Sequence, residues 1–473
     1  MELSYSNGAW MDEGMKQALE QRRIKGNLRR LPDENQDSSR WEPYLQHYST
    51  VSEGDNDVRV LDFSSNDYLG LAHDQEQHDL CKRVMSGLST TQLGATGSRL
   101  LSGDSGLFHQ LEQYLAVVHR RPAALLCNSG YDANLSLVSS LKCTHIVYDE
   151  YIHNSLHMGI RLWQTSSQLA NKPSTRTCSF SHNSSSDLRQ QLERLSAQRV
   201  NQVVVLVESV YSMDGDVAPL REMLNVCGEF GAKLIVDEAH GLGIYGQNRS
   251  GAMDGSVTGT FIGGTGVIAR DDLEDHPALF CSVHTFGKAA GCHGAVICGS
   301  ETLKQYLVNY AYPFIYSTAL PVHSLVTIKC AYETMTGPKG EALRQHLFHL
   351  VNVFRHSLQD HLYKIKAKHQ AALGRTVYLL PSTSPIQALM IPGNEVCTKF
   401  CNVLFQKARR RERPRYHIRL FPIKSPTVPA GQERIRIVLH ANNTVEEVET
   451  LVLLIMETLD EMDRISYPSH SRL

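Results

Sequence analysis

Short apolar runs alternate with helical patterns from Val58 to about Pro321. Four of these runs are stretches of strand-forming side chains that end in polar residues: AALLCNSG, THIVYDE, QVVVLVESV and AKLIVDEAH. Continuous apolar strands are typical of sheets that are covered on both faces, and glycine-rich turns and helices lie between these four. The pattern predicts an α/β domain built around a mostly parallel sheet.

The pattern changes beyond Pro321. Residues 322–372 look helical, and three candidate strands follow in TVYLLP, PIQALMIPG and RIRIVLH. A closing helix is expected from Thr444 to Ile465, because Thr444 and Glu447 have the spacing of a capping box. These elements predict a second, smaller α+β domain.

The first 60 residues are polar and show a helical pattern only around Met15 to Leu31. A Gly/Thr-rich stretch, Gly255–Gly266, has the composition of a flexible insertion. We expect three parts: an N-terminal segment 1–60, a large domain 61–325 and a small C-terminal domain 326–473.

Composition narrows the classes of protein to consider. The chain has 473 residues, 42% of them hydrophobic, and a formal net charge of −2 from 47 basic and 49 acidic side chains. This balance argues against a nucleic-acid binder, which usually carries a basic excess. The 11 cysteines include no CxxC pair, so the sequence offers neither a disulfide nor a zinc framework. A reducing compartment is expected.

The sequence carries one candidate targeting signal, at its C-terminus. No stretch approaches the ~18–20 apolar residues of a membrane span, and the N-terminal residues lack the apolar segment of a secretory signal. The chain ends in Ser471-Arg472-Leu473, one conservative change from the S-K-L peroxisomal address. We expect a peroxisomal protein, with a cytoplasmic location as the alternative.

Three familiar motifs lack their required context. Gly241-Leu-Gly243-Ile-Tyr-Gly246 matches a dinucleotide fingerprint, but DEAH separates it from the preceding strand. The DEAH sequence has no accompanying phosphate-binding P-loop anywhere in the chain. His153 and His157 have zinc-ligand spacing without the HExxH glutamate or an evident third ligand, so no metal is expected.

The polar ends of the predicted strands carry the chemistry, because ligands of open α/β sheets bind beyond the carboxyl ends of the strands. Asp237 ends one strand, His240 follows three residues later, and Lys288 lies in a glycine-containing turn. An Asp beside a ring nitrogen, a His beside a phenolic oxygen and a Lys able to form a Schiff base suit pyridoxal phosphate. Asn128-Ser129-Gly130-Tyr131, ahead of a helix, suits its phosphate group.

Long blocks of the chain resemble the α-oxoamine synthases, a family of pyridoxal phosphate-dependent, fold-type I, aminotransferase-like enzymes. The blocks run from about Met15 to Ile465 in the family's order, and include FSSNDYLGLAHD, GATGSRLLSGDSG, ESVYSMDGDVAPL, LIVDEAHGLGIYG and HTFGKAAGCHGA. The resemblance implies a large cofactor domain, a small α+β C-terminal domain and a homodimer with shared active sites.

The resemblance also implies roles for individual residues. Lys288 matches the Schiff-base lysine, Asp237 the partner of the pyridine nitrogen, His240 the partner of the ring 3-oxygen and His153 the histidine that stacks on the ring. The remaining matches are Ser212 beside the 3-oxygen, Gly130, Tyr131 and Thr285 at the phosphate, Ser317 and Thr318 at a neighbouring subunit's phosphate, Arg436 at the substrate carboxylate, Asn66 on the acyl-CoA side and, less securely aligned, Arg29 at the substrate.

The blocks look most like the branch that condenses L-alanine with pimeloyl-CoA, releasing CoA and CO₂, in biotin biosynthesis. Bulky His293, in the segment after Lys288, departs from the small residues of that branch and leaves the acyl donor open. The alternatives are an α-oxoamine synthase with another acyl thioester or amino acid, a non-catalytic subunit of such an enzyme, and a true aminotransferase.

Overall fold

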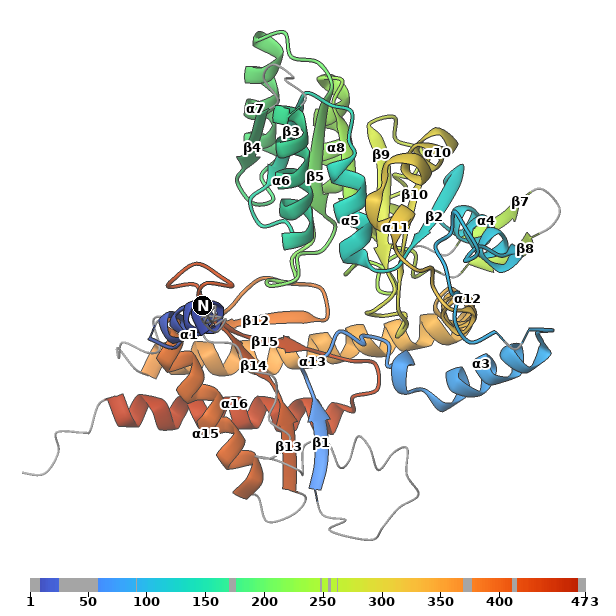
Figure 1. The fold of residues 1–473 in the computed structure, drawn as a ribbon. Coiled ribbons are helices and arrows are strands. Elements are labelled where there is room, and N and C mark those ends of the chain that lie inside the picture. The colour runs from blue at the N-terminus through green and yellow to red at the C-terminus, as the bar shows by residue number, and fades with distance from the viewer. Residues whose placement is uncertain are drawn as a thin grey trace, which may run out of the picture.

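The computed structural model describes most of the chain, and Figure 1 shows its arrangement. The described residues are 9–24, 58–90, 92–169, 176–246, 249–253, 257–261, 263–368, 377–410 and 415–466. Arg29 and the terminal Ser471-Arg472-Leu473 lie outside them. Among the described helices, none is long and apolar enough to cross a membrane.

The larger part is built on a seven-stranded sheet in the order β2-β10-β9-β6-β5-β3-β4. β10 runs antiparallel to both of its neighbours, and the other pairings are parallel. This confirms the predicted mostly parallel α/β sheet. The strands are β2 (Ala123–Cys127), β3 (His145–Asp149), β4 (Arg176–Phe180), β5 (Val203–Glu208), β6 (Lys233–Asp237), β9 (Leu279–Thr285) and β10 (Ala295–Gly299).

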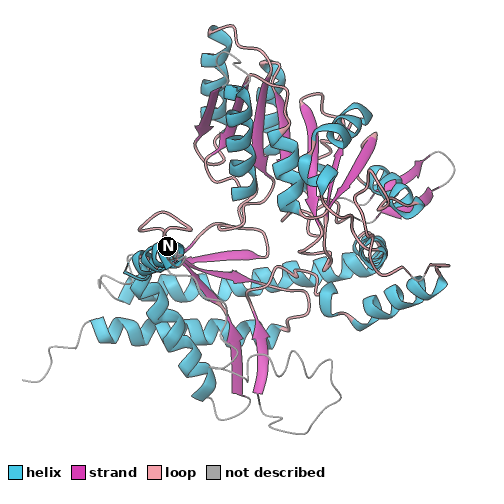
Figure 2. Cartoon of the chain, viewed as in Figure 1, coloured by secondary structure: helices cyan, strands magenta, loops and turns pink. Residues whose placement is uncertain are grey.

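Both faces of this sheet are buried, which explains its continuous apolar runs. In β5, Val203, Val205 and Val207 belong to one hydrophobic core, whereas Val204 and Leu206 belong to another. Successive side chains of a strand point to opposite faces, so each face needs its own cover of helices (Figure 2). These helices are α4 (Gly106–Val118), α5 (Gly130–Ser139), α6 (Asn154–Leu169), α7 (Ser185–Ala197), α8 (Leu220–Glu229), α9 (Val267–Arg270), α10 (Glu301–Tyr310) and α11 (Tyr312–Tyr316).

The C-terminal part is an α+β unit with an antiparallel sheet in the order β11-β12-β15-β14. Its strands are β11 (Tyr378–Leu379), β12 (Ile386–Met390), β14 (Phe421–Ile423) and β15 (Arg434–Val438). Its helices are α12 (Val322–Met335), α13 (Pro338–Lys368), α15 (Asn394–Arg410) and α16 (Val445–Ser466). The predicted capping box forms: the Glu447 carboxylate accepts from the Thr444 N–H at 3.0 Å, and the Thr444 hydroxyl accepts from the Glu447 N–H at 3.2 Å.

Three helices lie near the N-terminus: α1 (Ala9–Ile24), the short helix η1 (Leu71–His73) and α3 (Gln75–Gly87). Helix α1 begins earlier than the pattern around Met15 predicts. Strand β1 (Val58–Asp62) pairs in parallel with β13 (Arg415–Arg419), so the chain at the expected boundary 60/61 lies with the C-terminal part. The pairing joins strands more than 350 positions apart, which a local pattern does not reveal.

The Gly/Thr-rich stretch is not wholly irregular. Strand β8 (Val257–Phe261) pairs with β7 (Arg249–Met253) as an antiparallel hairpin. β8 reads Val-Thr-Gly-Thr-Phe, and its β-branched and aromatic residues favour a strand, which the glycine content of the stretch obscured in the sequence.

Candidate functional site

The candidate site lies at the carboxyl ends of the parallel strands. Asp237 ends β6, Glu208 ends β5, His153 follows β3 and Lys288 follows β9. Because these strands run parallel, their carboxyl ends lie at the same edge of the sheet, which brings the four groups together. The residues that the sequence placed at the cofactor ring are therefore brought together by the fold.

Lys288 is partly buried in the turn between β9 and β10. Burial lowers the pKa of its amine to about 8; Asp237 and Glu208 act in the opposite direction, and Arg436 adds to the lowering. A free lysine has a pKa of about 10.4. The lowered value leaves an appreciable neutral fraction of the amine near neutral pH, as a nucleophile or proton acceptor requires.

Asp237 is held by two hydrogen-bond donors. Its Oδ2 accepts from Asn134 Nδ2 at 2.7 Å, and its Oδ1 accepts from the Ala239 N–H at 2.9 Å. The residue is only 5% exposed. A buried carboxylate with such donors is suited to hold a protonated heteroaromatic nitrogen.

His240 is buried and contacts Tyr68, whose hydroxyl lies 2.5 Å from His240 Nδ1. Burial, reinforced by Lys288 and Arg436, moves the pKa of His240 well below its usual range, so the ring is neutral. Burial raises the pKa of Tyr68 to about 12, so its hydroxyl keeps its proton. The tyrosine can donate to Nδ1, which leaves Nε2–H as the donor for a phenolic oxygen.

The start of α5 forms a cradle for an anion. Ser129 caps the helix by accepting from the Asp132 N–H at 3.0 Å, and Gly130 and Tyr131 supply the first backbone N–H groups. A Cβ on Gly130 would lie 2.1 Å from Thr285 Oγ1, so the glycine keeps this hydroxyl beside the helix start. Helix N-termini with free N–H groups bind phosphate groups well.

Arg436, on β15 of the small sheet, reaches the large part of the molecule. Its Nε donates to the Ser212 carbonyl at 2.6 Å, and another guanidinium nitrogen donates to Asn66 Oδ1 at 2.9 Å. The neighbouring Arg434 forms an ion pair with Asp214. Three predicted positions, Asn66, Ser212 and Arg436, therefore form one contact group beside the cofactor residues.

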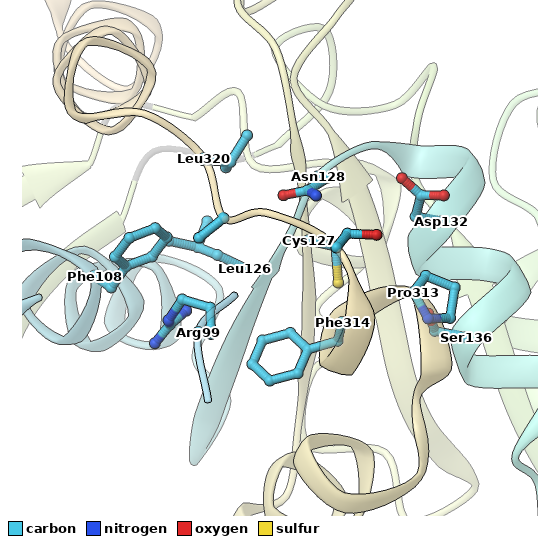
Figure 3. Close-up of a pocket in the computed structure, with 12 residues that line it drawn as sticks. Arg99, Phe108, Leu126, Cys127, Asn128, Asp132, Ser136, Pro313, Phe314 and Leu320 are labelled. Atoms are coloured by element: carbon cyan, nitrogen blue, oxygen red, sulfur yellow. The ribbon is translucent and has the colours of Figure 1, made fainter. Parts of the chain in front are cut away.

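Ser317 and Thr318 follow α11, and Ser317 lines a pocket. Figure 3 shows Asn128, Asp132 and Phe314, which also line it. Asn128 Nδ2 donates to the Thr318 carbonyl at 2.8 Å. The segment thus packs beside the polar end of β2 in its own chain. Its predicted role at a neighbouring subunit's phosphate stays a prediction.

The sequence placed Glu208 at a polar strand end without giving it a role, and it gave no role to Tyr68, Asn134 or Ser155. Glu208 is 3% exposed, and burial together with nearby Asp237 raises the pKa of its carboxyl well above the usual range. Tyr68 and Asn134 contact residues in distant segments, His240 and Asp237, which the local sequence does not reveal. His293, by contrast, is exposed, so its bulk lies at the surface.

His182 forms a second charged group next to the site. Its Nδ1 lies 2.9 Å from Asp149 Oδ1, and its Nε2 lies 2.8 Å from Asp216 Oδ2. Burial alone acts to lower the pKa of His182. The hydrogen bonds to Asp149 and Asp216 outweigh burial and raise this pKa to about 9. The charged imidazole thereby ties the end of β3 to the loop that carries Ser212.

The sequence is similar to those of known proteins along most of its length. The family model for class I and II aminotransferases matches residues 58–455. The chain is 35% identical over 418 residues to the 8-amino-7-oxononanoate synthase of Emericella nidulans, covering 85% of this chain and 90% of that protein. It is 32% identical over 396 residues to the enzyme of the same name from Marinobacter nauticus, covering 83% and 86%.

Solved structures show the same fold. The serine palmitoyltransferase of Sphingomonas wittichii superposes with a TM-score of 0.68 at 23% identity, covering 91% of this chain and 98% of that chain. The 8-amino-7-oxononanoate synthase of Francisella tularensis superposes with a TM-score of 0.61 at 23% identity, covering 85% and 98%.

The chain therefore belongs to the class I and II aminotransferase family. Within it, the chain is an α-oxoamine synthase, a pyridoxal phosphate-dependent enzyme of the acyltransferase type. The site fits the cofactor: the cradle at Gly130 suits its phosphate, Asp237 its ring nitrogen, His240 its phenolic oxygen and the Lys288 amine its aldehyde.

Replacing Gly130 by alanine should weaken cofactor binding. The new Cβ would displace the Thr285 hydroxyl from the helix start, so we expect the Kd for pyridoxal phosphate to rise about tenfold or more. Titration of the cofactor-free enzyme by visible absorbance measures this. Gly106→Ala is the matched control, since Gly106 also begins a helix and has no atom within 4 Å of the new Cβ. Equal affinity in Gly130→Ala would refute the assigned cradle.

Replacing His182 by glutamine should destabilise the enzyme in a pH-dependent way. Because folding raises the pKa of His182 to about 9, its contribution is full below the ordinary value of about 6.5 and is lost as the pH rises through 9. At pH 6.5 we expect the free energy of unfolding to fall by about 2 kcal/mol. Denaturant titrations should show this difference shrinking towards pH 10. His78→Gln, at an exposed histidine of α3, should show no such trend.

Proposed function

We propose that the enzyme condenses L-alanine with pimeloyl-CoA to give 8-amino-7-oxononanoate, CoA and CO₂, a step of biotin biosynthesis. The observation that carries the proposal is the 35% identity over 418 residues with a relative of that name. The geometry supports it, because the described site holds groups for the cofactor, a basic amine and an arginine for an amino-acid carboxylate.

Each residue has a part in this reaction. Bound pyridoxal phosphate would supply an electron sink that stabilises negative charge at the α-carbon. The Lys288 amine, with its pKa lowered to about 8 through burial, accepts the α-proton of alanine at Nζ. Arg436 binds the carboxylate of alanine, for which its planar guanidinium is suited. The α-carbon then forms a bond to the thioester carbonyl carbon as the C–S bond breaks, and CoA leaves as the thiolate, which takes a proton from water. The carboxyl group departs as CO₂, and its bonding electron pair stays on the α-carbon, which receives the proton held on Lys288 Nζ.

Three alternatives differ in substrate or activity. Structural likeness to a serine palmitoyltransferase shows the fold and makes another acyl thioester or amino acid the runner-up. A non-catalytic subunit is disfavoured, because Lys288, Asp237 and His240 stand together with their supporting hydrogen bonds. A true aminotransferase would need an amino acceptor in a second half-reaction.

A panel of acyl-CoAs decides among these functions. We expect CoA release from L-alanine with pimeloyl-CoA, and a fall of at least about 10³-fold in Lys288→Ala, which loses the reacting amine. Lys82→Ala, at an exposed lysine of α3, is the matched control and should keep full activity. Turnover with other acyl-CoAs but not with pimeloyl-CoA would move the assignment to the runner-up. Amino transfer without CoA release would indicate an aminotransferase.

We also propose that the enzyme is a homodimer. Several large apolar side chains are exposed in one chain: Leu93, Leu100, Leu101, Tyr312 and Tyr316. The Ala319 N–H donates to the Gly97 carbonyl at 2.9 Å, which brings the loop of these leucines beside the segment of these tyrosines. A contiguous apolar surface of this kind marks a protein interface, and it adjoins Ser317 and Thr318.

Finally, we propose a peroxisomal location on the basis of Ser471-Arg472-Leu473. A fluorescent protein fused ahead of the full chain should give a punctate signal in cells. Deleting the three residues should make the signal diffuse. A diffuse signal with the tail intact would support the cytoplasmic alternative.

A further inference from the structure

A chain of hydrogen bonds, buried at its Asp237 end, links Asp237 to His153, the residue predicted to stack on the cofactor ring. Asn134 Nδ2 donates to Asp237 Oδ2 at 2.7 Å and to Ser155 Oγ at 3.0 Å. Ser155 Oγ lies 2.8 Å from His153 Nδ1, and the Ser155 N–H donates to the same nitrogen at 3.2 Å. Asn134 is 2% exposed and Ser155 is completely buried, so water does not compete for the contacts of Asn134, whereas His153 at the other end of the chain is exposed.

The direction of each hydrogen bond follows from the carboxylate. Asn134 must present its amide nitrogen to Asp237, because the reverse orientation would place two acceptor oxygens 2.7 Å apart. Its other N–H donates to Ser155 Oγ. A hydroxyl has one proton to donate, and with Asn134 acting as the donor on one side that proton is directed to His153 Nδ1.

His153 Nδ1 therefore faces two donors, the hydroxyl and the backbone N–H of Ser155. A nitrogen in this position carries a lone pair, and the proton of the neutral ring lies on Nε2. We propose that Asn134 and Ser155 are positioning residues that fix His153 as the neutral, Nε2-protonated tautomer and couple this choice to the charge on Asp237.

The tautomer of His153 affects the charge around the cofactor ring, and this part of the inference rests on the proposed function of the site. A charged imidazole at His153 would compete with the protonated pyridine nitrogen for the charge of Asp237. Burial is the main cause of the lowered pKa of His153. Asp237 acts to raise this pKa, and Lys288 acts to lower it further. The titratable groups around His153 are Asp237 on β6, Lys288 after β9, Glu208 on β5, His240 after β6 and His157 on α6.

The tautomer is measured directly by ¹⁵N NMR of histidine-labelled enzyme, with and without pyridoxal phosphate. The signals of His153 are assigned by their loss in His153→Asn. At pH 7 we expect a protonated Nε2 and an unprotonated Nδ1. An imidazolium, or a proton on Nδ1, would overturn the proposal. This readout does not involve the acyl donor, so it is independent of the pimeloyl-CoA assignment.

Ser155→Ala removes the hydroxyl donor. We expect mixed tautomers, a His153 pKa closer to the ordinary value of about 6.5, an acid limb of kcat/KM displaced to higher pH and a loss in kcat/KM of about tenfold. Ser155→Thr, which retains the hydroxyl, should restore the wild-type ¹⁵N pattern. Ser324→Ala, at a buried serine of α12, is the control for loss of a buried hydroxyl. Unchanged ¹⁵N shifts and pH profile in Ser155→Ala would refute the positioning role.

Discussion

Asp237 places a carboxylate inside the protein, where a negative charge is stable only beside hydrogen-bond donors and a cation. Asn134 and the Ala239 N–H supply the donors, and the Lys288 amine lies within the field of the carboxylate. The same charge is suited to hold the ring nitrogen of bound pyridoxal phosphate, the role that the family resemblance implies for Asp237. Asp237 is the charge that Lys288 and His153 share: burial lowers the pKa of both groups and Asp237 opposes that lowering, so the carboxylate helps to set how readily each gives up a proton.

Neighbouring parallel strands bring three carboxyl groups to one edge of the sheet, and the protein stabilises each in a different way. Asp237 is compensated by donors, whereas Asp149 is paired with the charged ring of His182. Glu208 has neither a cation of its own nor a full set of donors, and burial raises the pKa of its carboxyl well above the usual range. A neutral Glu208 beside an ionised Asp237 avoids the repulsion of two adjacent charges in the interior.

The small antiparallel sheet also contributes to the site. Arg436 on β15 contacts Ser212 from the loop after β5 and Asn66 from the segment after β1. Arg434 pairs with Asp214 in the same loop, and His182 holds that loop through Asp216. The loop is thus anchored from both parts of the molecule. This anchoring orients the arginine predicted to bind the substrate carboxylate before any substrate arrives, which reduces the ordering cost of binding.

Much of this protein follows from local sequence. Continuous apolar runs predicted β2, β3, β5 and β6 of the large sheet, but not β4, β9 and β10. Thr444 and Glu447 indicated the start of the last helix, and the spacing of Asp237, His240 and Lys288 indicated the cofactor. Contacts between distant segments were decided by tertiary structure alone. Tyr68 meets His240 across 172 positions, Asn134 meets Asp237 across 103, and β1 pairs with β13. The physical reason is that periodicity and capping depend on neighbours in the chain, whereas the partner of a buried polar group depends on where the fold returns the chain.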